Sequence, residues 1–210
     1  MNASAGIGES RWPPVLVLLA FMALNIAIRV PWLLPAIEGV LVVTLVAADP
    51  GSVARHARWL RRLAIGLVVI LVAAALWNTV LLVRDLIDGI GVTTSPTRLL
   101  ATGALVWLGN NLGFSLLYWF MDGGGPIARS HLSTPVDFAF TQQMSPELAP
   151  PGWRPVFLDY LHLGFTNATA FSPTDVMPLT HRAKYVMLLQ ATVALALFGL
   201  IVARAVNAFT

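Results

Sequence analysis

The residues whose types could carry chemistry are concentrated between Tyr160 and Arg182. This stretch follows a polar, proline-rich region and leads directly into an apolar segment that starts near Ala183. A semi-apolar helix, a threonine-rich turn, an aspartate, a proline and a second helix make up the layout of a re-entrant pore loop. Non-helical backbone at membrane depth is tolerated only where it is buried in protein or lines an aqueous cavity. The pattern therefore predicts a re-entrant segment over residues 157–178 that lines a path for ions or solutes.

An acid–base pair is the other chemistry that this stretch offers. Asp159 and His162 are three residues apart, so they can meet on one helical face. Such a pair more often forms a local hydrogen bond than a proton relay. The four histidines have no metal-ligand spacing such as HExxH, and no GxSxG motif or glycine-rich phosphate loop is present. We therefore expect no enzyme, no metal site and no cofactor, and an intramembrane enzyme using Asp159 and His162 is the least favoured hypothesis.

Polar side chains also lie within the apolar segments, where charged and amide groups face protein or water. They are Arg29, Glu38, Asn78, Asn110, Asn111 and Gln190. Arg29 and Glu38 flank a turn with two prolines, and we expect an ion pair there, near the membrane interface. The amides are expected to form interhelical hydrogen bonds worth about 0.6–2 kcal/mol each. A direct contact with a substrate is the less favoured alternative for the amides.

Composition indicates an integral membrane protein. Of the 210 residues, 57% are hydrophobic and 11% are charged, whereas a soluble domain carries roughly 25% charged residues. The absence of cysteine excludes disulfides, thiolate metal sites and cysteine nucleophiles. The net charge is only +3, and the basic cluster at 55–62 fits membrane orientation better than nucleic-acid binding. Arginine far outnumbers lysine, which is typical of a high-GC bacterial source, so we expect a multi-pass protein of the bacterial inner membrane.

Five apolar segments predict transmembrane helices, because a span needs about 20 mainly apolar residues. They cover about 12–30, 33–48, 60–83, 99–121 and 183–206. The first has neither the basic region nor the cleavage site of a signal peptide, so we interpret it as a span. Residues 122–154 are rich in proline and glycine and predict a polar loop. The predicted fold is all-α integral membrane, one domain over 1–210, with about five transmembrane helices and a re-entrant pore helix and turn before the last.

Residues 169–178, TAFSPTDVMP, resemble the end of the pore loop in tetrameric potassium-channel-like proteins, TTVGYGD with a proline three residues later. Thr169 aligns with the first threonine, Asp175 with the terminal aspartate and Pro178 with the proline. The region also resembles the C-terminal part of an uncharacterised family of small bacterial inner-membrane proteins. The resemblance implies a pore helix from Phe157 to Ala168, a homotetramer and a path for monovalent cations. The implied filter-like residues are Thr166, Thr169, Ala170, Phe171, Ser172, Pro173, Thr174 and Asp175.

The filter-like residues depart from the potassium pattern at three positions. Ser172 and Thr174 stand where the filter has glycine, and Pro173 stands where it has tyrosine. Glycine permits the backbone that points successive carbonyls at the ion, whereas proline fixes its own φ. We therefore expect a wider turn, lined by hydroxyl groups, that passes cations with poor selectivity. The alternative is a degenerate loop that only plugs the bundle.

Charge distribution bears on orientation. With the basic cluster at 55–62 in the cytoplasm, nine of the thirteen basic residues and the pore-like segment lie on the cytoplasmic side. Potassium channels open their pore loop to the extracellular side, so the charge pattern and the resemblance disagree. Two functions remain: an oligomeric, channel-like protein, which we favour, and a non-conducting membrane scaffold or partner subunit with a degenerate pore-like loop.

Overall fold

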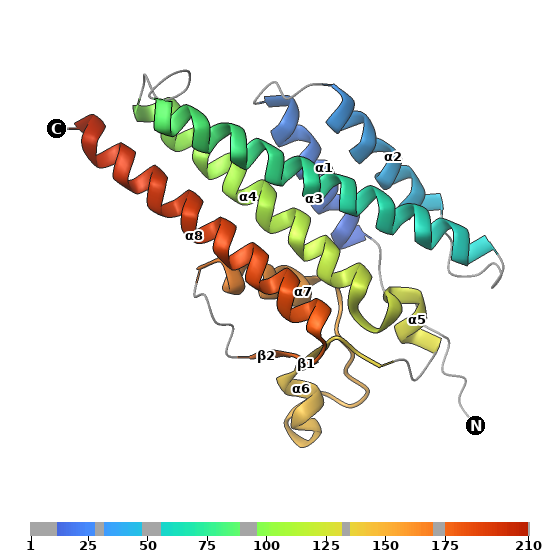
Figure 1. The fold of residues 1–210 in the computed structure, drawn as a ribbon. Coiled ribbons are helices and arrows are strands. Elements are labelled where there is room, and N and C mark those ends of the chain that lie inside the picture. The colour runs from blue at the N-terminus through green and yellow to red at the C-terminus, as the bar shows by residue number, and fades with distance from the viewer. Residues whose placement is uncertain are drawn as a thin grey trace, which may run out of the picture.

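The computed structural model describes residues 12–27, 32–47, 56–88, 96–131, 135–169 and 175–209, and it is mostly helical (Figure 1). The helices are α1 (Trp12–Ala27), α2 (Leu33–Ala47), α3 (His56–Asp88), α4 (Pro96–Met121), α5 (Pro126–His131), α6 (Thr141–Met144), α7 (Phe157–Thr169) and α8 (His181–Phe209). The short turns are η2 (Asp122–Gly124) and η3 (Pro146–Leu148), and the strands are β1 (Phe138–Phe140) and β2 (Val176–Pro178).

Three of the described helices, α3, α4 and α8, are long and apolar enough to cross a membrane. Their apolar stretches have 27, 28 and 23 residues, and they coincide with the spans predicted over 60–83, 99–121 and 183–206. Helices α1 and α2 are apolar but have only 16 and 15 residues. At about 1.5 Å per residue they measure about 24 and 23 Å, less than the roughly 30 Å of a hydrocarbon core. Membrane-spanning length is therefore established for three of the five predicted spans.

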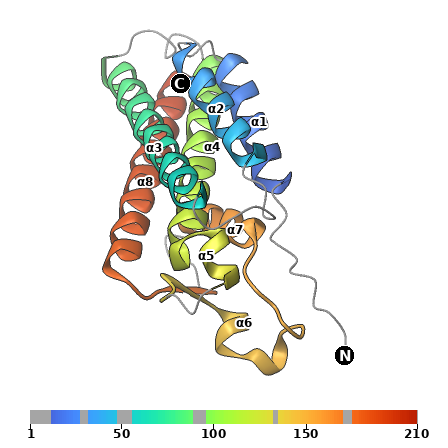
Figure 2. The same ribbon diagram turned by 90° about the vertical axis from the view of Figure 1, so that its right-hand side faces the viewer.

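Helix α4 occupies the centre of the bundle and packs against α1, α3, α7 and α8. Figure 2 shows α1 and α2 on one side of α4 and α8 on the other, and α3 packs against α2, α4 and α8. The larger core cluster contains, at one end, a group of aromatic side chains from α4, β1 and α7; the fully buried ones are Phe114, Tyr118, Trp119, Phe138, Phe157 and Tyr160. At the other end a smaller aliphatic cluster joins α3, α4 and α8.

The chain reverses sharply where α4 ends. Gly123, Gly124 and Gly125 all have positive φ, at 54°, 84° and 92°, and glycine adopts these values without steric cost. The region predicted as a polar loop over 122–154 then contains α5, β1, α6 and η3. Strand β1 pairs antiparallel with β2, with Phe138 opposite Pro178 and Phe140 opposite Val176. The residues just before α8 are thus joined to residues shortly after α4, at an end of the bundle that we call the sheet end.

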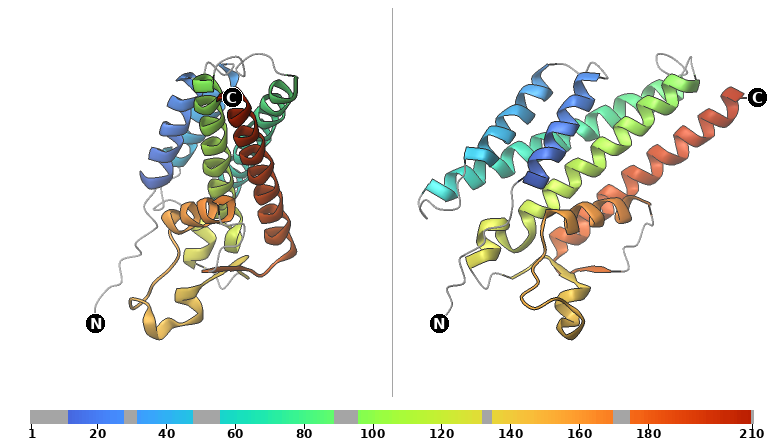
Figure 3. Two further views of the ribbon diagram at one scale, coloured as in Figure 1. Left: turned by 90° about the vertical axis from the view of Figure 1, so that its left-hand side faces the viewer. Right: turned by 180° about the vertical axis from the view of Figure 1, so that it is seen from behind.

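Helix α7 starts at the sheet end and runs beside α4 toward the middle of the bundle. Near its start, Tyr160 bonds to Asp122 at the end of α4, and near its end the ring of Phe165 meets that of Trp107. On α7 itself, Tyr160 and Phe165 are five positions apart, which is about 8 Å along a helix. Beyond α7 the described chain resumes at Asp175, which again lies at the sheet end beside β1. Figure 3 shows α7 inclined to α4 and α8 rather than parallel to them.

Candidate functional site

Helix α7 has two chemically different faces. One face is buried and consists of Phe157, Tyr160, Leu163, Gly164, Asn167 and Ala168. On the other side His162, Thr166 and Thr169 follow one another at spacings of four and three, so they share a face. None of these three side chains is buried in the chain. The helix is therefore held by one face and presents a row of polar groups on the other.

The buried face of α7 is fixed by hydrogen bonds to α4 and α8. Gln190 Oε1 accepts from the Tyr118 hydroxyl at 2.6 Å and from Asn167 Nδ2 at 2.8 Å, while Gln190 Nε2 donates to the carbonyl oxygen of Gly164 at 2.9 Å. Asn111 Oδ1 is a more distant acceptor, 3.4 Å from Gln190 Nε2. We name Asn111, Tyr118, Asn167 and Gln190 the amide cluster; each is at most 3% exposed. Each buried amide has found polar partners, as interhelical polar contacts in a membrane require.

The amide cluster brings together two of the predicted polar residues, Asn111 and Gln190. Sequence reasoning had not placed Asn167 in it, although Asn167 lies three residues after Gly164 on the apolar face of a predicted helix. Asn110 points elsewhere, since its Nδ2 donates to Thr79 Oγ1 of α3 at 2.7 Å. Asn78 lines a small cavity between α1, α3 and α4.

A second group of buried polar residues lies at the sheet end. The carboxylate of Asp137 is fully buried and accepts two hydrogen bonds from Arg182, Nε to Oδ1 at 2.6 Å and Nη2 to Oδ2 at 2.5 Å. The Thr180 hydroxyl donates to the same Oδ1 at 2.5 Å. This paired geometry fixes both the distance and the orientation of the guanidinium group. It ties the start of α8 to the residues that lead into β1.

Asp122 completes this group. Its Oδ1 accepts the backbone N–H of Asp137 at 2.6 Å, and its Oδ2 accepts the Tyr160 hydroxyl at 2.5 Å. Arg129 donates to the main-chain oxygen of Asp122 at 2.8 Å and lies over the Tyr160 ring, 4.9 Å from its centroid. We name Asp122, Asp137, Tyr160, Thr180 and Arg182 the carboxylate clamp. Each oxygen of both carboxylates accepts at least one hydrogen bond, so the clamp joins the end of the α4–η2 segment to α7 and α8.

Sequence reasoning had not identified the carboxylate clamp. One local signal existed, because Asp122 directly follows an apolar helix and precedes three glycines. The partners of the two aspartates are 38 and 45 residues away in sequence, so spacing alone could not reveal them.

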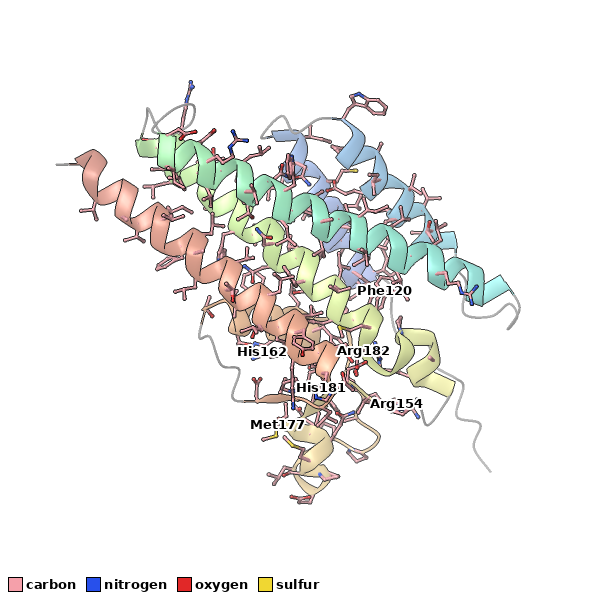
Figure 4. The ribbon with its side chains drawn as sticks, viewed as in Figure 1. Phe120, Arg154, His162, Met177, His181 and Arg182 are labelled. Atoms are coloured by element: carbon pink, nitrogen blue, oxygen red, sulfur yellow. The ribbon has the colours of Figure 1, made fainter. Side chains whose placement is uncertain are left out.

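The unburied side of α7 contains the pore-like residues that the structure describes. His162 Nε2 lies 2.9 Å from Asp175 Oδ2, and the two side chains are 58% and 39% exposed. The Thr166 hydroxyl donates to the carbonyl of His162 at 3.0 Å, and the Thr169 hydroxyl to that of Phe165 at 2.8 Å. Figure 4 labels His162 on α7, and His181 and Arg182 at the start of α8. His162, Thr166, Thr169 and Asp175 are named the polar face.

The predicted pairing of Asp159 with His162 is replaced by other contacts. Asp159 Oδ2 accepts the backbone N–H of Val156 at 2.7 Å, at the start of its own helix, and His162 turns to Asp175. The filter-like residues 170–174 and Arg29 lie outside the described residues. Within the described ranges, no three His, Cys, Asp or Glu side chains come together in a way that could hold a metal ion.

No family model, curated protein or solved structure matches this chain.

Proposed function

We propose that this chain forms an oligomeric, poorly selective cation pore in the bacterial inner membrane, with residues 157–178 as a re-entrant element. The observation that carries the proposal is the polar face of α7, which no other described part of the chain buries. A single copy does not enclose an ion path with one such face, so several copies must surround it. The resemblance to potassium-channel-like proteins favours four.

The expected depth of the α7 threonines in the membrane supports this interpretation. Side chains of α7 contact Asp122, just after α4, and Trp107 within α4, and α4 is one of the three helices that can cross a membrane. If α4 spans the bilayer, Thr166 and Thr169 lie well below the membrane surface. Hydroxyl and imidazole groups at that depth face protein or water rather than lipid. A second copy of the chain or an aqueous path must therefore cover the polar face.

The chemistry of the polar face suits hydrated cations. Asp175 supplies negative potential at the mouth of the re-entrant segment. The threonine hydroxyls direct their protons to helix carbonyls, so their oxygen lone pairs point away from the helix. Hydroxyl and carboxylate oxygens attract monovalent cations without the carbonyl rings that make a potassium filter selective. Weak discrimination between K⁺ and Na⁺ is expected.

The described basic residues favour a cytoplasmic sheet end. Seven described basic residues belong to the sheet end: Arg58, Arg61, Arg62, Arg129, Arg154, Arg182 and Lys184. Three belong to the opposite end: Arg84, Arg98 and Arg204. Since basic residues concentrate in cytoplasmic loops, the re-entrant element opens to the cytoplasm in this proposal, the reverse of a potassium channel. A reporter fused to the C-terminus, beyond α8, should then read outside the cytoplasm.

Flux measurements test the proposal directly. Purified protein in liposomes should pass both K⁺ and Na⁺ above the rate of empty liposomes. Asp175→Asn should lower the flux several-fold because it removes the charge at the mouth. Asp159→Asn, at the start of α7, is the matched control, and it should leave the flux unchanged. Flux no greater than that of empty liposomes for every cation tried would reject the pore.

A non-conducting scaffold or partner subunit is the second candidate, and the amide cluster favours it. Those hydrogen bonds hold α7 firmly against α4 and α8, which also suits a helix that merely fills the bundle. The replaced glycines at 172 and 174 point the same way. Native mass spectrometry separates the candidates, because the scaffold predicts a monomer or dimer without flux and the pore predicts a larger homo-oligomer with flux.

A further inference from the structure

A buried carboxyl group lies on the other side of α4, away from α7. Glu38 of α2 is 0% exposed, and its Oε1 accepts a hydrogen bond from Asn25 Nδ2 of α1. Its second oxygen, Oε2, is buried and has no hydrogen-bond partner among the described residues. Such a half-satisfied acid inside an apolar bundle marks a functional site more often than a structural one.

The surroundings of Glu38 contain no compensating charge in the described residues. Helix α2 packs against α1 and α3, and neither α1 nor the rest of α2 contains an ionisable side chain. The charged residues of α3 lie near its two ends: His56, Arg58, Arg61 and Arg62 at one, and Arg84, Asp85 and Asp88 at the other. A carboxylate buried without a cation is costly, and the group instead takes up a proton.

A small cavity adjoins this site. It has a volume of about 20 Å³ and lies between α1, α3 and α4, which is room for about one water molecule. Asn25 and Asn78 supply polar groups to its lining, and Ala75 is part of its wall. Asn25 therefore touches both the carboxyl group of Glu38 and the cavity. A water molecule there would lie between the amides of Asn25 and Asn78, and Asn25 separates it from the carboxyl group of Glu38.

We infer that Glu38 is an intramembrane proton-binding site, which exchanges its proton through the cavity lined by Asn25 and Asn78. The ligand is a proton: binding breaks one O–H bond of hydronium and forms one O–H bond on Glu38, and release to water reverses both changes. This site is independent of the polar face of α7. It gives the α1–α2 side of the molecule a chemistry of its own, whether or not the chain conducts cations.

Infrared spectroscopy of the purified protein in liposomes tests the assignment. At neutral pH the wild-type protein should show the carbonyl band of a protonated carboxylic acid, and this band should shift in D₂O. Glu38→Gln, which nearly preserves shape, should abolish the band. Glu147→Gln, at an exposed acid on η3, should retain it. A wild-type spectrum without the band, or a band that survives Glu38→Gln, would overturn the proposal.

Two further variants keep the test informative if Glu38→Gln fails to fold. Asn25→Leu should move the band to higher frequency, because the carboxyl group loses its hydrogen-bond donor. Ala75→Leu should fill the cavity and slow the D₂O shift several-fold. An unmoved band in Asn25→Leu would remove Asn25 from the site, and unchanged exchange in Ala75→Leu would exclude the cavity as the proton route.

Discussion

The buried polar groups on the two sides of α4 differ in whether they have hydrogen-bond partners. On the side of α7 and α8, the amide cluster and the carboxylate clamp give their buried polar groups one or more partners. On the side of α1, α2 and α3, Glu38 Oε2 and Asn110 Oδ1 are buried without partners among the described residues. The first side also contains the largest aromatic core, whereas the second contains a small cavity.

This difference has different consequences for how the helices are held on each side. Saturated polar networks favour one arrangement of helices, because any displacement leaves a buried donor or acceptor unpaired. Unsaturated groups beside a cavity leave room for water or a proton. The α7 side should therefore be sensitive to the loss of a polar partner, and the α1–α3 side should tolerate it.

The largest loss of stability is expected from Asp137→Asn. The variant removes the charge that holds Arg182 and places an amide proton donor against it. Because Asp137 is fully buried, we expect a decrease of about 3 kcal/mol in the free energy of unfolding; the partial exposure of Arg182 limits it to that value. Unfolding in mixed detergent micelles measures the change. Glu147→Gln is the surface control. A similar loss of stability in that variant would show that the carboxylate clamp contributes no more than an exposed acid.

Gln190→Leu should be the next most damaging substitution. It leaves the Tyr118 hydroxyl, Asn167 and the Gly164 carbonyl each without one partner in the protein interior. We expect a loss of about 2 kcal/mol and faster proteolysis of the segment around α7. The same micelle assay gives the energy, and mass spectrometry of the cleavage sites locates the loosened part. A stability equal to wild type would mean that the amide cluster contributes little to holding α7.

Gly164→Ala tests how closely α7 must approach α4. A Cβ at this position would lie 2.1 Å from Ser115 Oγ and 3.3 Å from the Asn111 carbonyl oxygen. We expect a loss of about 1–2 kcal/mol from overpacking. Ser115→Ala in the same chain should recover part of it, since the hydroxyl is the nearest obstacle. Gly199→Ala of α8, where nothing lies within 4 Å, should be neutral or slightly stabilising.

The smallest effect is expected from Asn110→Leu. Asn110 donates a hydrogen bond to Thr79, but its own side-chain oxygen is buried without a partner among the described residues. Losing the hydrogen bond destabilises the fold, removing the unpaired oxygen stabilises it, and the two effects nearly cancel. The free energy of unfolding should change by less than about 1 kcal/mol. A loss as large as that of Gln190→Leu would show that both sides of α4 depend equally on their polar contacts.

Much of the fold could be predicted from composition alone. The apolar runs at 60–83, 99–121 and 183–206 predict α3, α4 and α8, because length and hydropathy are properties of one segment. The partners of polar residues are different, since they depend on contacts across the fold. Asn110 and Asn111 are neighbours in sequence, yet they face α3 and α8, because adjacent residues diverge by about 100° around a helix.

The candidate site shows the same limit. The sequence predicted a polar, pore-like region around Thr166, Thr169 and Asp175; the two threonines are not buried on α7, and Asp175 contacts His162 of that helix. Their anchoring could not be predicted, because Tyr160 finds Asp122 across 38 residues and Asn167 finds Gln190 across 23. Glu38 was expected to pair with the nearby Arg29. Its described partner is Asn25, 13 residues away on the facing helix.

The pairing of β1 with β2 has a consequence for how the protein is made. Strand β1 and helix α7 leave the ribosome before β2, and Gln190 follows later still. A nascent chain that ends before Val176 still lacks Gln190, the partner that Asn111, Tyr118 and Asn167 share. We therefore expect the packing of α7 against α4 to be completed only after the first part of α8, which contains Gln190, has been synthesised. Insertion of this protein is completed from its C-terminal end.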